Sequence, residues 1–183
     1  ETIGLDGTTA STTASTVSTI CNGSACGLTL VQSELSDISA AKLVIGDSSS
    51  GKMYIDGVTL SHISGGVTLN SSGSNGSVEF GSGGATIKLA TINAGNGITI
   101  NGNVSAQSAI FNADYDANGT GTFTIASGYD ITSTDNQSIS ITANDIDIYS
   151  LATISSGTGS TTIAVSDGGT IGLGGTSGNM TIT

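Results

Sequence analysis

The chain contains no proline, no tryptophan and no arginine among its 183 residues, and it has only three lysines and one histidine. Charged residues make up 9% of the chain, far below the roughly 25% of ordinary globular domains. The net charge of −11 and the absence of any basic cluster exclude a surface that neutralises nucleic-acid phosphates. The same charge disfavours an anionic membrane surface, and no apolar run approaches the ~20 residues that span a bilayer.

Cysteine is also scarce, with Cys21 and Cys26 close together in the segment CNGSAC. The turn formers Asn22 and Gly23 lie between them and allow a small loop to close. The sequence therefore predicts a disulfide loop in an oxidising, extracellular setting. Two cysteines and the distant His62 do not fill a tetrahedral zinc site.

Glycine, serine and threonine are abundant instead, and isoleucine and valine alternate with polar residues. In GITIN (97–101), Ile98 and Ile100 point to one side while Thr99 and Asn101 point to the other. This two-residue period is typical of a strand with one buried face. The same alternation predicts strands in VTLN (67–70), SVEF (77–80), TIKLA (86–90), GTFTIA (121–126), SISITA (138–143), DIDIYS (145–150), TTIAV (161–165), GTIGL (169–173) and NMTIT (179–183).

The spacing of these runs favours a solenoid over a sandwich. Phrases recur at roughly 18–25 residues, the length of one β-helix coil, and LATI itself occupies 89–92 and 151–154. Aromatic residues make up only 4% of the chain, too few for the core of a sandwich. The window 33–46 comes nearest to helical spacing, but its ending KLVIG favours a strand, so no helix is expected there. We expect an all-β, single-stranded parallel β-helix, or β-solenoid, of roughly nine coils.

The tetrapeptide TIGL occurs near both ends of the chain, at 2–5 and at 170–173, and each copy leads to a further strand, LTLV or MTIT. We interpret the two copies as the same rung one superrepeat apart. Residues 1–183 are then one β-solenoid segment, one period of a tandem array, and residues 6–27 form a surface excursion with a Thr/Ser-rich stretch and the cysteine loop. Neither end shows a capping helix, a proline or a charge cluster, so both ends are expected to present open rungs.

Over most of residues 28–183 the chain resembles the long tandem arrays of filamentous-haemagglutinin-like secreted proteins. The resemblance lies in phrases such as ELSDISAAKLVIG (34–46), GGATIKLATINAGNGITINGNVSA (83–106), DYDANGTGTFTIASG (114–128) and SISITANDIDIYSLATISSG (138–157). Members of that family are right-handed parallel β-helices that are exported to form surface fibres or adhesins. The resemblance implies a right-handed rod segment rather than an enzyme.

The segment GDSSSGKM (46–53) nearly matches the phosphate-binding loop G-x-x-x-x-G-K-[ST]. Met53 stands where a serine or threonine would hold Mg²⁺. The following residues are typical of a strand, not of the helix whose N-terminus cradles phosphate. We therefore interpret this segment as a turn between coils.

The segment DYDANG (114–119) matches the start of a calcium-binding loop, with Asp114, Asp116 and Asn118 at alternating positions. Oxygen ligands at this spacing can converge on one hard cation. The twelfth position of the loop, which should be a bidentate glutamate, is Ile125. Calcium is the one candidate cofactor that the sequence offers, as a weak and partly hydrated site.

No set of residues points to catalysis. Asp145 and Asp147 are spaced by two on the outer face of a strand, where they confer solubility. His62 has no obvious partner, the chain has no arginine, and the G-x-S-x-G elbow is absent. The sequence predicts that the protein is not an enzyme.

The chain carries seven N-glycosylation sequons in turn-like segments, at Asn22, Asn70, Asn75, Asn103, Asn118, Asn136 and Asn179. These observations predict an extracellular or cell-surface structural protein, a filament subunit or repeat that stacks head to tail on further copies of itself. The alternative is an adhesin or glycan-binding stalk module. Ice binding through threonine arrays ranks third, because TFT, TST and TIT do not recur at one rung position in successive coils. Partners other than itself and glycans are not expected, nor are nucleic acid or membrane insertion.

Overall fold

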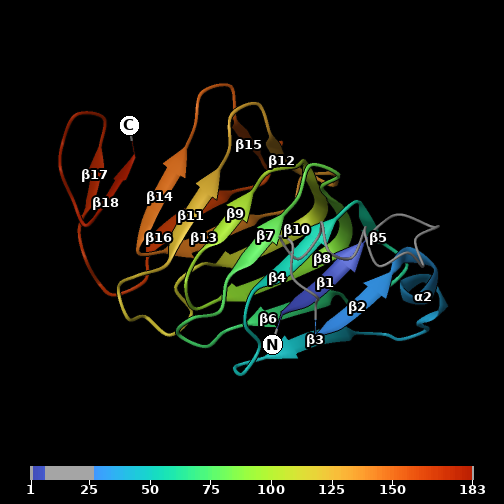
Figure 1. Ribbon diagram of the computed structural model, residues 1–183. Helices are drawn as coiled ribbons and strands as arrows, with labels where there is room; N and C mark the ends of the chain where they lie inside the picture. Colours follow the sequence, from blue (N-terminus) through green and yellow to red (C-terminus); the bar gives the residue numbers. More distant parts are fainter. Residues whose placement is uncertain (1, 7–26, 183) are drawn as a thin grey trace.

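A computed structural model describes residues 2–6 and 27–182 of the chain (Figure 1). Every ladder between the described strands is parallel, and the described residues include one short helix, α2 (Gln32–Asp37). The strands are β1 (Ile3–Asp6), β2 (Leu28–Val31), β3 (Leu43–Asp47), β4 (Met53–Asp56), β5 (Val58–Leu60), β6 (Val67–Ser71), β7 (Val78–Phe80), β8 (Ala85–Ala94), β9 (Ile98–Ile100), β10 (Val104–Asn112), β11 (Thr122–Ile125), β12 (Asp130–Ser133), β13 (Ile139–Ala143), β14 (Asp145–Ile148), β15 (Thr153–Ser155), β16 (Thr161–Val165), β17 (Ile171–Leu173) and β18 (Met180–Ile182). The expected all-β parallel solenoid is confirmed.

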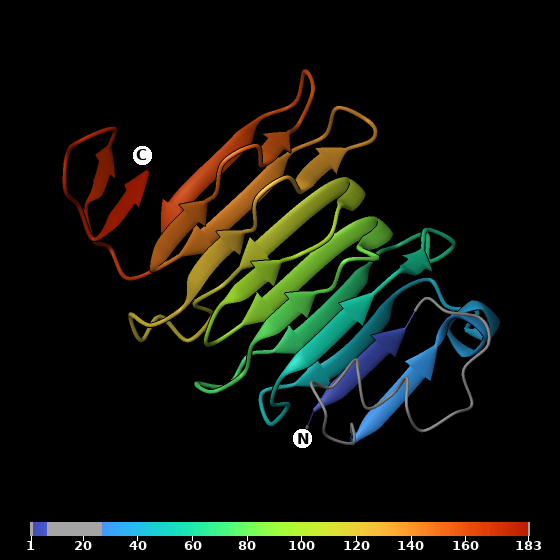
Figure 2. The ribbon, with the colours of Figure 1, turned by 45° about the horizontal axis from the view of Figure 1, so that its top comes forward.

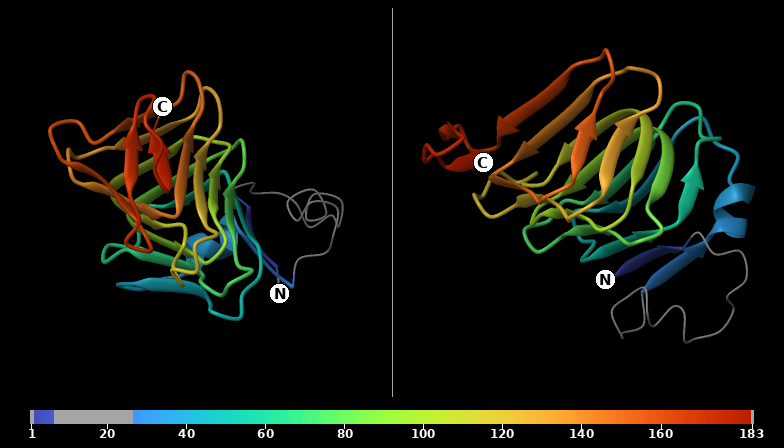
Figure 3. Two further views of the ribbon diagram at one scale, coloured as in Figure 1. Left: turned by 90° about the vertical axis from the view of Figure 1, so that its left-hand side faces the viewer. Right: turned by 90° about the horizontal axis from the view of Figure 1, so that it is seen from above.

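The chain coils through three faces (Figures 2 and 3). The first face is the sheet β14-β11-β9-β7-β4-β1-β2. The other two faces share long strands: the first part of β8 pairs with β5, whereas its second part pairs with β6. The second face therefore runs through β5, β8, β10, β12 and β15, and the third face runs through β3, β6, β8, β10, β13 and β16.

The length of each turn can be read from the first face. Val78 pairs with Met53, 25 positions earlier, and Ile98 pairs with Val78, 20 positions earlier. Phe123 then follows Ile98 by 25 positions, and Ile146 follows Phe123 by 23. The described residues make about six turns, so the expectation of nine coils is not confirmed. The observed turns lie in the upper part of the expected range, and residues 7–26 lie outside the described part.

The core consists of stacked columns of apolar side chains. On the first face, Leu5, Ile55, Phe80, Ile100 and Ile125 occupy one inward position in successive strands, and all five are fully buried. Neighbouring strands lie about 4.8 Å apart, so each side chain packs directly on the next. Burial of each such side chain contributes roughly 1.5–3 kcal/mol. The predicted aliphatic ladder is therefore present, with Phe80 as its one aromatic member.

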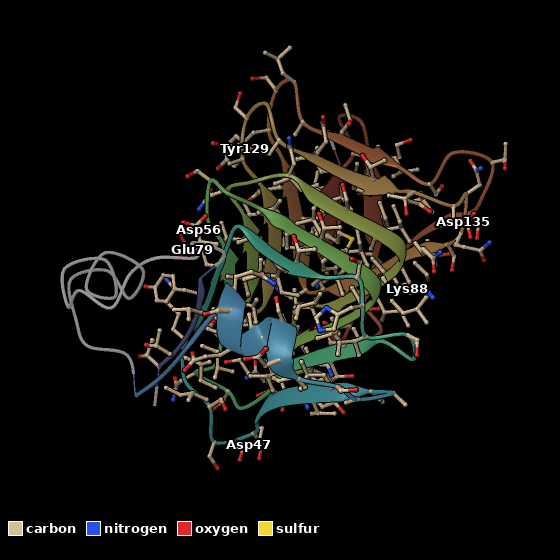
Figure 4. All side chains as sticks on the ribbon, turned by 90° about the vertical axis from the view of Figure 1, so that its right-hand side faces the viewer. Asp47, Asp56, Glu79, Lys88, Tyr129 and Asp135 are labelled. Carbon is tan, nitrogen blue, oxygen red and sulfur yellow. The ribbon has the colours of Figure 1, made fainter. Side chains whose placement is uncertain are left out.

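The expectation that neither end has a capping helix is wrong, because α2 covers the N-terminal end of the solenoid (Figure 4). Its Leu35 is fully buried against the core. The Gln32 side chain accepts a hydrogen bond from the Thr59 backbone N–H and donates one to the Thr59 carbonyl oxygen, at 2.8 and 2.9 Å. A side-chain amide thus takes the place of a neighbouring strand along β5. The expectation of no helix in 33–46 is thus wrong for residues 33–37, where the buried Leu35 holds a short helix, whereas Leu43 begins the strand β3 as expected.

The first strand of the chain is not the outermost strand of its sheet. β1 lies between β2 and β4, although β2 follows it in the sequence (Figure 2). The surface excursion predicted at 6–27 lies almost entirely outside the described residues, as do Cys21 and Cys26. No helix among residues 2–6 and 27–182 is long and apolar enough to cross a membrane.

Candidate functional site

Corresponding strand pairs lie near the two ends of the chain, one (β1–β2) within the first face and the other (β17–β18) as a separate two-stranded sheet beside β14. Near the N-terminus, β1 pairs with β2 so that Ile3 lies opposite Leu28. Near the C-terminus, β17 pairs with β18 so that Ile171 lies opposite Met180. The hydrogen bonds also correspond, since the Thr2 carbonyl accepts from the Leu28 N–H at 3.3 Å and the Thr170 carbonyl accepts from the Met180 N–H at 3.1 Å. Both TIGL copies therefore form a strand that pairs in parallel with the strand that follows.

The two copies differ along their second edge. On β1 this edge faces β4, and the Ile3 N–H donates to the Lys52 carbonyl at 2.9 Å. Ile3 and Leu5 are buried in consequence. On β17 the corresponding edge pairs with no strand in the described part of the chain, and Ile171 and Leu173 are 43% and 65% exposed. Identical side chains are core residues at one end and surface residues at the other.

Side chains satisfy part of the free backbone on β17 and on the outer edge of β2. The Leu173 N–H donates to the Thr176 hydroxyl at 2.9 Å, and that hydroxyl donates back to the Leu173 carbonyl at 2.7 Å. On the outer edge of β2, the Val31 N–H donates to the Glu34 carboxylate at 3.0 Å. Unpaired strand edges recruit other chains, and local side-chain bonds of this kind blunt them. Thr176 and Glu34 are edge guards that sequence reasoning missed.

A groove of about 470 Å³ separates β14 from β18. The two strands are joined by the Thr181 N–H, which donates to the Asp145 carboxylate at 3.1 Å. Exposed apolar side chains gather beside this groove at Ile148, Tyr149 and Leu151. The alternation in DIDIYS predicts that Ile146 and Ile148 both point inward, but Ile148 is exposed because this is the last described turn of the first face. The C-terminal end is thus the less covered end of the solenoid.

The second face carries a column of hydroxyl groups that sequence reasoning also missed. The same outward position holds a threonine or serine in five successive strands: Thr59, Thr86, Ser105, Thr132 and Ser155. This column consists of single hydroxyl residues and not of the TFT, TST or TIT triplets considered in the sequence. The sequence pattern that marks this column is a short triplet with a hydroxyl residue at its centre, such as VTL, ATI or VSA. These triplets recur at uneven spacing along the chain.

The three predicted calcium ligands lie in one turn. The buried Asp114 carboxylate accepts hydrogen bonds from the N–H groups of Asn118 and Gly119, both at 3.1 Å, and from the Ser166 hydroxyl at 2.5 Å. The Asn118 amide donates to the Asp116 carboxylate at 2.8 Å. No cluster of three or more His, Cys, Asp or Glu side chains suited to a metal ion occurs among the described residues. The geometry accounts for the motif as a hydrogen-bonded turn, and calcium binding stays a prediction.

The predicted glycosylation sites are scattered over the surface rather than gathered in one place. Asn75 is exposed in the turn before β7, whereas the part-buried Asn70 accepts a hydrogen bond from the Asn93 amide at 2.7 Å. Exposed sequons also occur at Asn103, Asn118, Asn136 and Asn179. Asn22 lies outside the described residues, together with the predicted disulfide between Cys21 and Cys26.

The phosphate-loop look-alike at 46–53 is a turn that leads into a strand, as predicted. Met53 is fully buried at the start of β4, where a Mg²⁺-binding hydroxyl would stand, and no helix follows it. Within the turn, the Asp47 carboxylate accepts a hydrogen bond from the Ser49 N–H at 2.8 Å. His62 is exposed in the turn after β5.

One ion pair lies on the outer surface of the first face. The Lys52 ammonium is 2.7 Å from the Glu79 carboxylate and 4.3 Å from the centre of the Tyr54 ring. Partial burial lowers the pKa of Lys52, but its interactions with Glu79 and Tyr54 outweigh this and hold the pKa above its ordinary value. The Asn101 amide donates to Glu79 at 3.1 Å and links the pair to the turn of β9, which stacks directly on that of Glu79. This arrangement joins neighbouring turns and has no feature of a reactive site.

Comparisons with protein-family models, with curated proteins and with solved structures found no match for this chain. The resemblance to filamentous-haemagglutinin-like arrays therefore stays a prediction.

Proposed function

We propose that the protein is a structural segment of an extracellular fibre, which lengthens by adding further copies of itself head to tail. The observation that supports this proposal is the recurrence of one parallel strand pair in the same register, β1–β2 at the N-terminal end of the first face and β17–β18 as a separate two-stranded sheet near the C-terminus. A parallel solenoid grows by repeating one local contact, because each coil touches only its neighbours. The free edge of β17 corresponds to the edge through which β1 pairs with β4. A further copy can therefore continue the sheet at β17.

The helix α2 restricts which faces of the solenoid can continue into another copy. Gln32 occupies the edge of β5, so the second face cannot continue past this end while α2 is in place. The first face ends in β2, and the third face ends in β3, whose outer side pairs with no described strand. Growth through the first face, rather than through all three, is therefore the form of the proposal that the structure favours.

The extracellular setting, a right-handed coil, the Cys21–Cys26 disulfide and glycans on the exposed sequons belong to the same proposal. They rest on the sequence and on the family resemblance. Low charge and a surface rich in hydroxyl and amide groups are compatible with this setting. Calcium at Asp114, Asp116 and Asn118 is its weakest component, because both Asp114 oxygens already accept hydrogen bonds.

Sedimentation velocity over a range from micromolar to millimolar protein, with negative-stain electron microscopy of the same samples, tests the proposal. Unbranched rods that lengthen with concentration are the expected result. A monomer at every concentration would contradict the fibre. Monomers that bind immobilised glycans would favour the alternative, an adhesin or glycan-binding stalk module.

A further inference from the structure

We propose that the free edge of β17 is the joint between copies and that it adds to the outer edge of β2 of a second copy. This inference rests on the proposed fibre and names the surfaces that form its contact. Ile171 would lie opposite Leu28 of the second copy, and Leu173 opposite Leu30.

The two free edges are complementary in direction. The backbone groups of Thr170 and Gly174 bond to β18, so those of Ile171 and Leu173 point away from it. In β2, the Leu28 N–H bonds to β1, so the backbone groups of Thr29 and Val31 point outward. Alternate residues of a parallel strand serve opposite edges. The edge presented by β17 is thus the one that β1 presents to β4, and β2 offers the matching side.

The side chains on these edges lack cover in the single copy. Ile171 and Leu173 are exposed, and so is Leu28 on β2. The equivalent residues on β1, Ile3 and Leu5, are buried between β2 and β4. The pairing of β1 with β2 shows that Ile-Gly-Leu and Leu-Thr-Leu segments fit side by side in parallel register. A second copy would give the C-terminal segment the burial that the N-terminal segment already has.

An exchange in which β17 replaces β1 on β4 of the second copy is less favourable. It would remove one Ile-Gly-Leu strand to insert another, so burial would not increase. β1 also belongs to the same chain as β4, which gives it the advantage of an intramolecular contact. Addition to β2 gains a new pairing and, among the hydrogen bonds of the described residues, breaks those of the Thr176 and Glu34 side chains.

The side-chain hydrogen bonds of Thr176 and Glu34 compete with the joint and so weaken its affinity. For the sheet to continue, the Leu173 N–H and carbonyl must leave Thr176, and the Val31 N–H must leave Glu34. Thr176→Ala removes the competing hydroxyl and should lower the dissociation constant of the joint about fivefold, the equivalent of one typical hydrogen bond. Thr176→Ser keeps the hydroxyl and should behave like the wild type.

The test combines these variants with a matched pair at the C-terminal end. Leu173→Lys should abolish assembly in sedimentation velocity, whereas Leu151→Lys should not. Leu151 is more exposed still, at 84%, but it lies outside β17. A photo-reactive benzoylphenylalanine at position 173 should crosslink to Leu28–Val31 of another copy. Circular dichroism and thermal unfolding establish that each variant is folded.

The outcomes separate the joint from the fibre. Oligomers that persist in Leu173→Lys, or crosslinks that map to Met53–Asp56, would overturn this joint and leave the fibre standing. A wild type and a Thr176→Ala variant that both stay monomeric would overturn the fibre and the joint together. Loss of assembly in Leu173→Lys alone, with crosslinks to β2, supports both.

Discussion

The matched residues Leu5 and Leu173 allow a direct test of how the two ends differ. Both are the last residue of a TIGL segment, and both lie on a strand that pairs in parallel with the following strand. Leu5 is fully buried, whereas Leu173 is 65% exposed. We expect Leu5→Ala to lower the free energy of unfolding by about 2–5 kcal/mol, the range for truncation of a buried leucine. Leu173→Ala should change it by less than about 1 kcal/mol in the monomer.

The magnitude for Leu5 follows from its surroundings. The side chain lies inside the first face, and its register neighbours are Leu30 on β2 and Ile55 on β4. The neighbouring strands are held by their own ladders, so the vacated space cannot collapse fully. The loss then combines the transfer free energy of the removed methyl groups with a cavity term. A value in the upper half of the range is expected.

Urea unfolding of dilute protein, followed by circular dichroism, measures both changes. Unfolding of a solenoid need not be two-state, so the transition should be followed at two wavelengths and with the slope m compared between variants. Equal destabilisation by the two substitutions would refute the reasoning. It would mean either that Leu173 is buried in solution or that β1 does not lie between β2 and β4.

Substitutions at three further positions test individual contacts. Gln32→Ala leaves the Thr59 N–H and carbonyl without their partner and should cost about 1–3 kcal/mol in chemical unfolding, whereas Gln32→Glu should restore only the acceptor. Asp114→Ala removes the acceptor of two backbone N–H groups and of the Ser166 hydroxyl, so a similar or larger loss is expected, and an unchanged melting temperature would contradict the assigned turn. The pKa of Lys52 is raised in the folded state, so its contribution to the free energy of unfolding is complete below pH 10.5 and is lost as the pH rises through the folded-state pKa. Lys52→Met should therefore reduce the loss of stability that urea unfolding measures between neutral and alkaline pH.

Periodicity predicted the repeating part of the fold well. The alternation in GITIN and DIDIYS identifies inward positions such as Ile98, Ile100 and Ile146, all of which are buried. The two-residue period of a strand is local, so a short window suffices to detect it. Ile148 is the exception, since its exposure depends on whether another turn covers it. Local sequence carries no information about that.

The ends were predicted poorly for a related reason. A repeat pattern describes what stacks on what, but the terminal turns have no neighbour on one side, and their cover comes from residues outside the pattern. Gln32, Glu34 and Thr176 act through hydrogen bonds to backbone groups, and no hydropathy pattern marks such a role. The position of β1 between β2 and β4 is also invisible to a linear reading, because the order of strands in space departs from their order in the chain.

The contrast between Leu5 and Leu173 should depend on protein concentration if the joint forms as proposed. In dilute protein, Leu173 is a surface residue and its truncation costs little. In an assembled sample it lies opposite Leu30 of the next copy and becomes a core residue like Leu5. Leu173→Ala should therefore shift the unfolding midpoint more at high concentration than at low, whereas the effect of Leu5→Ala stays constant, because binding to the folded state alone stabilises it by mass action. A concentration-independent effect at Leu173, measured where the wild type assembles, would show that the copies meet elsewhere.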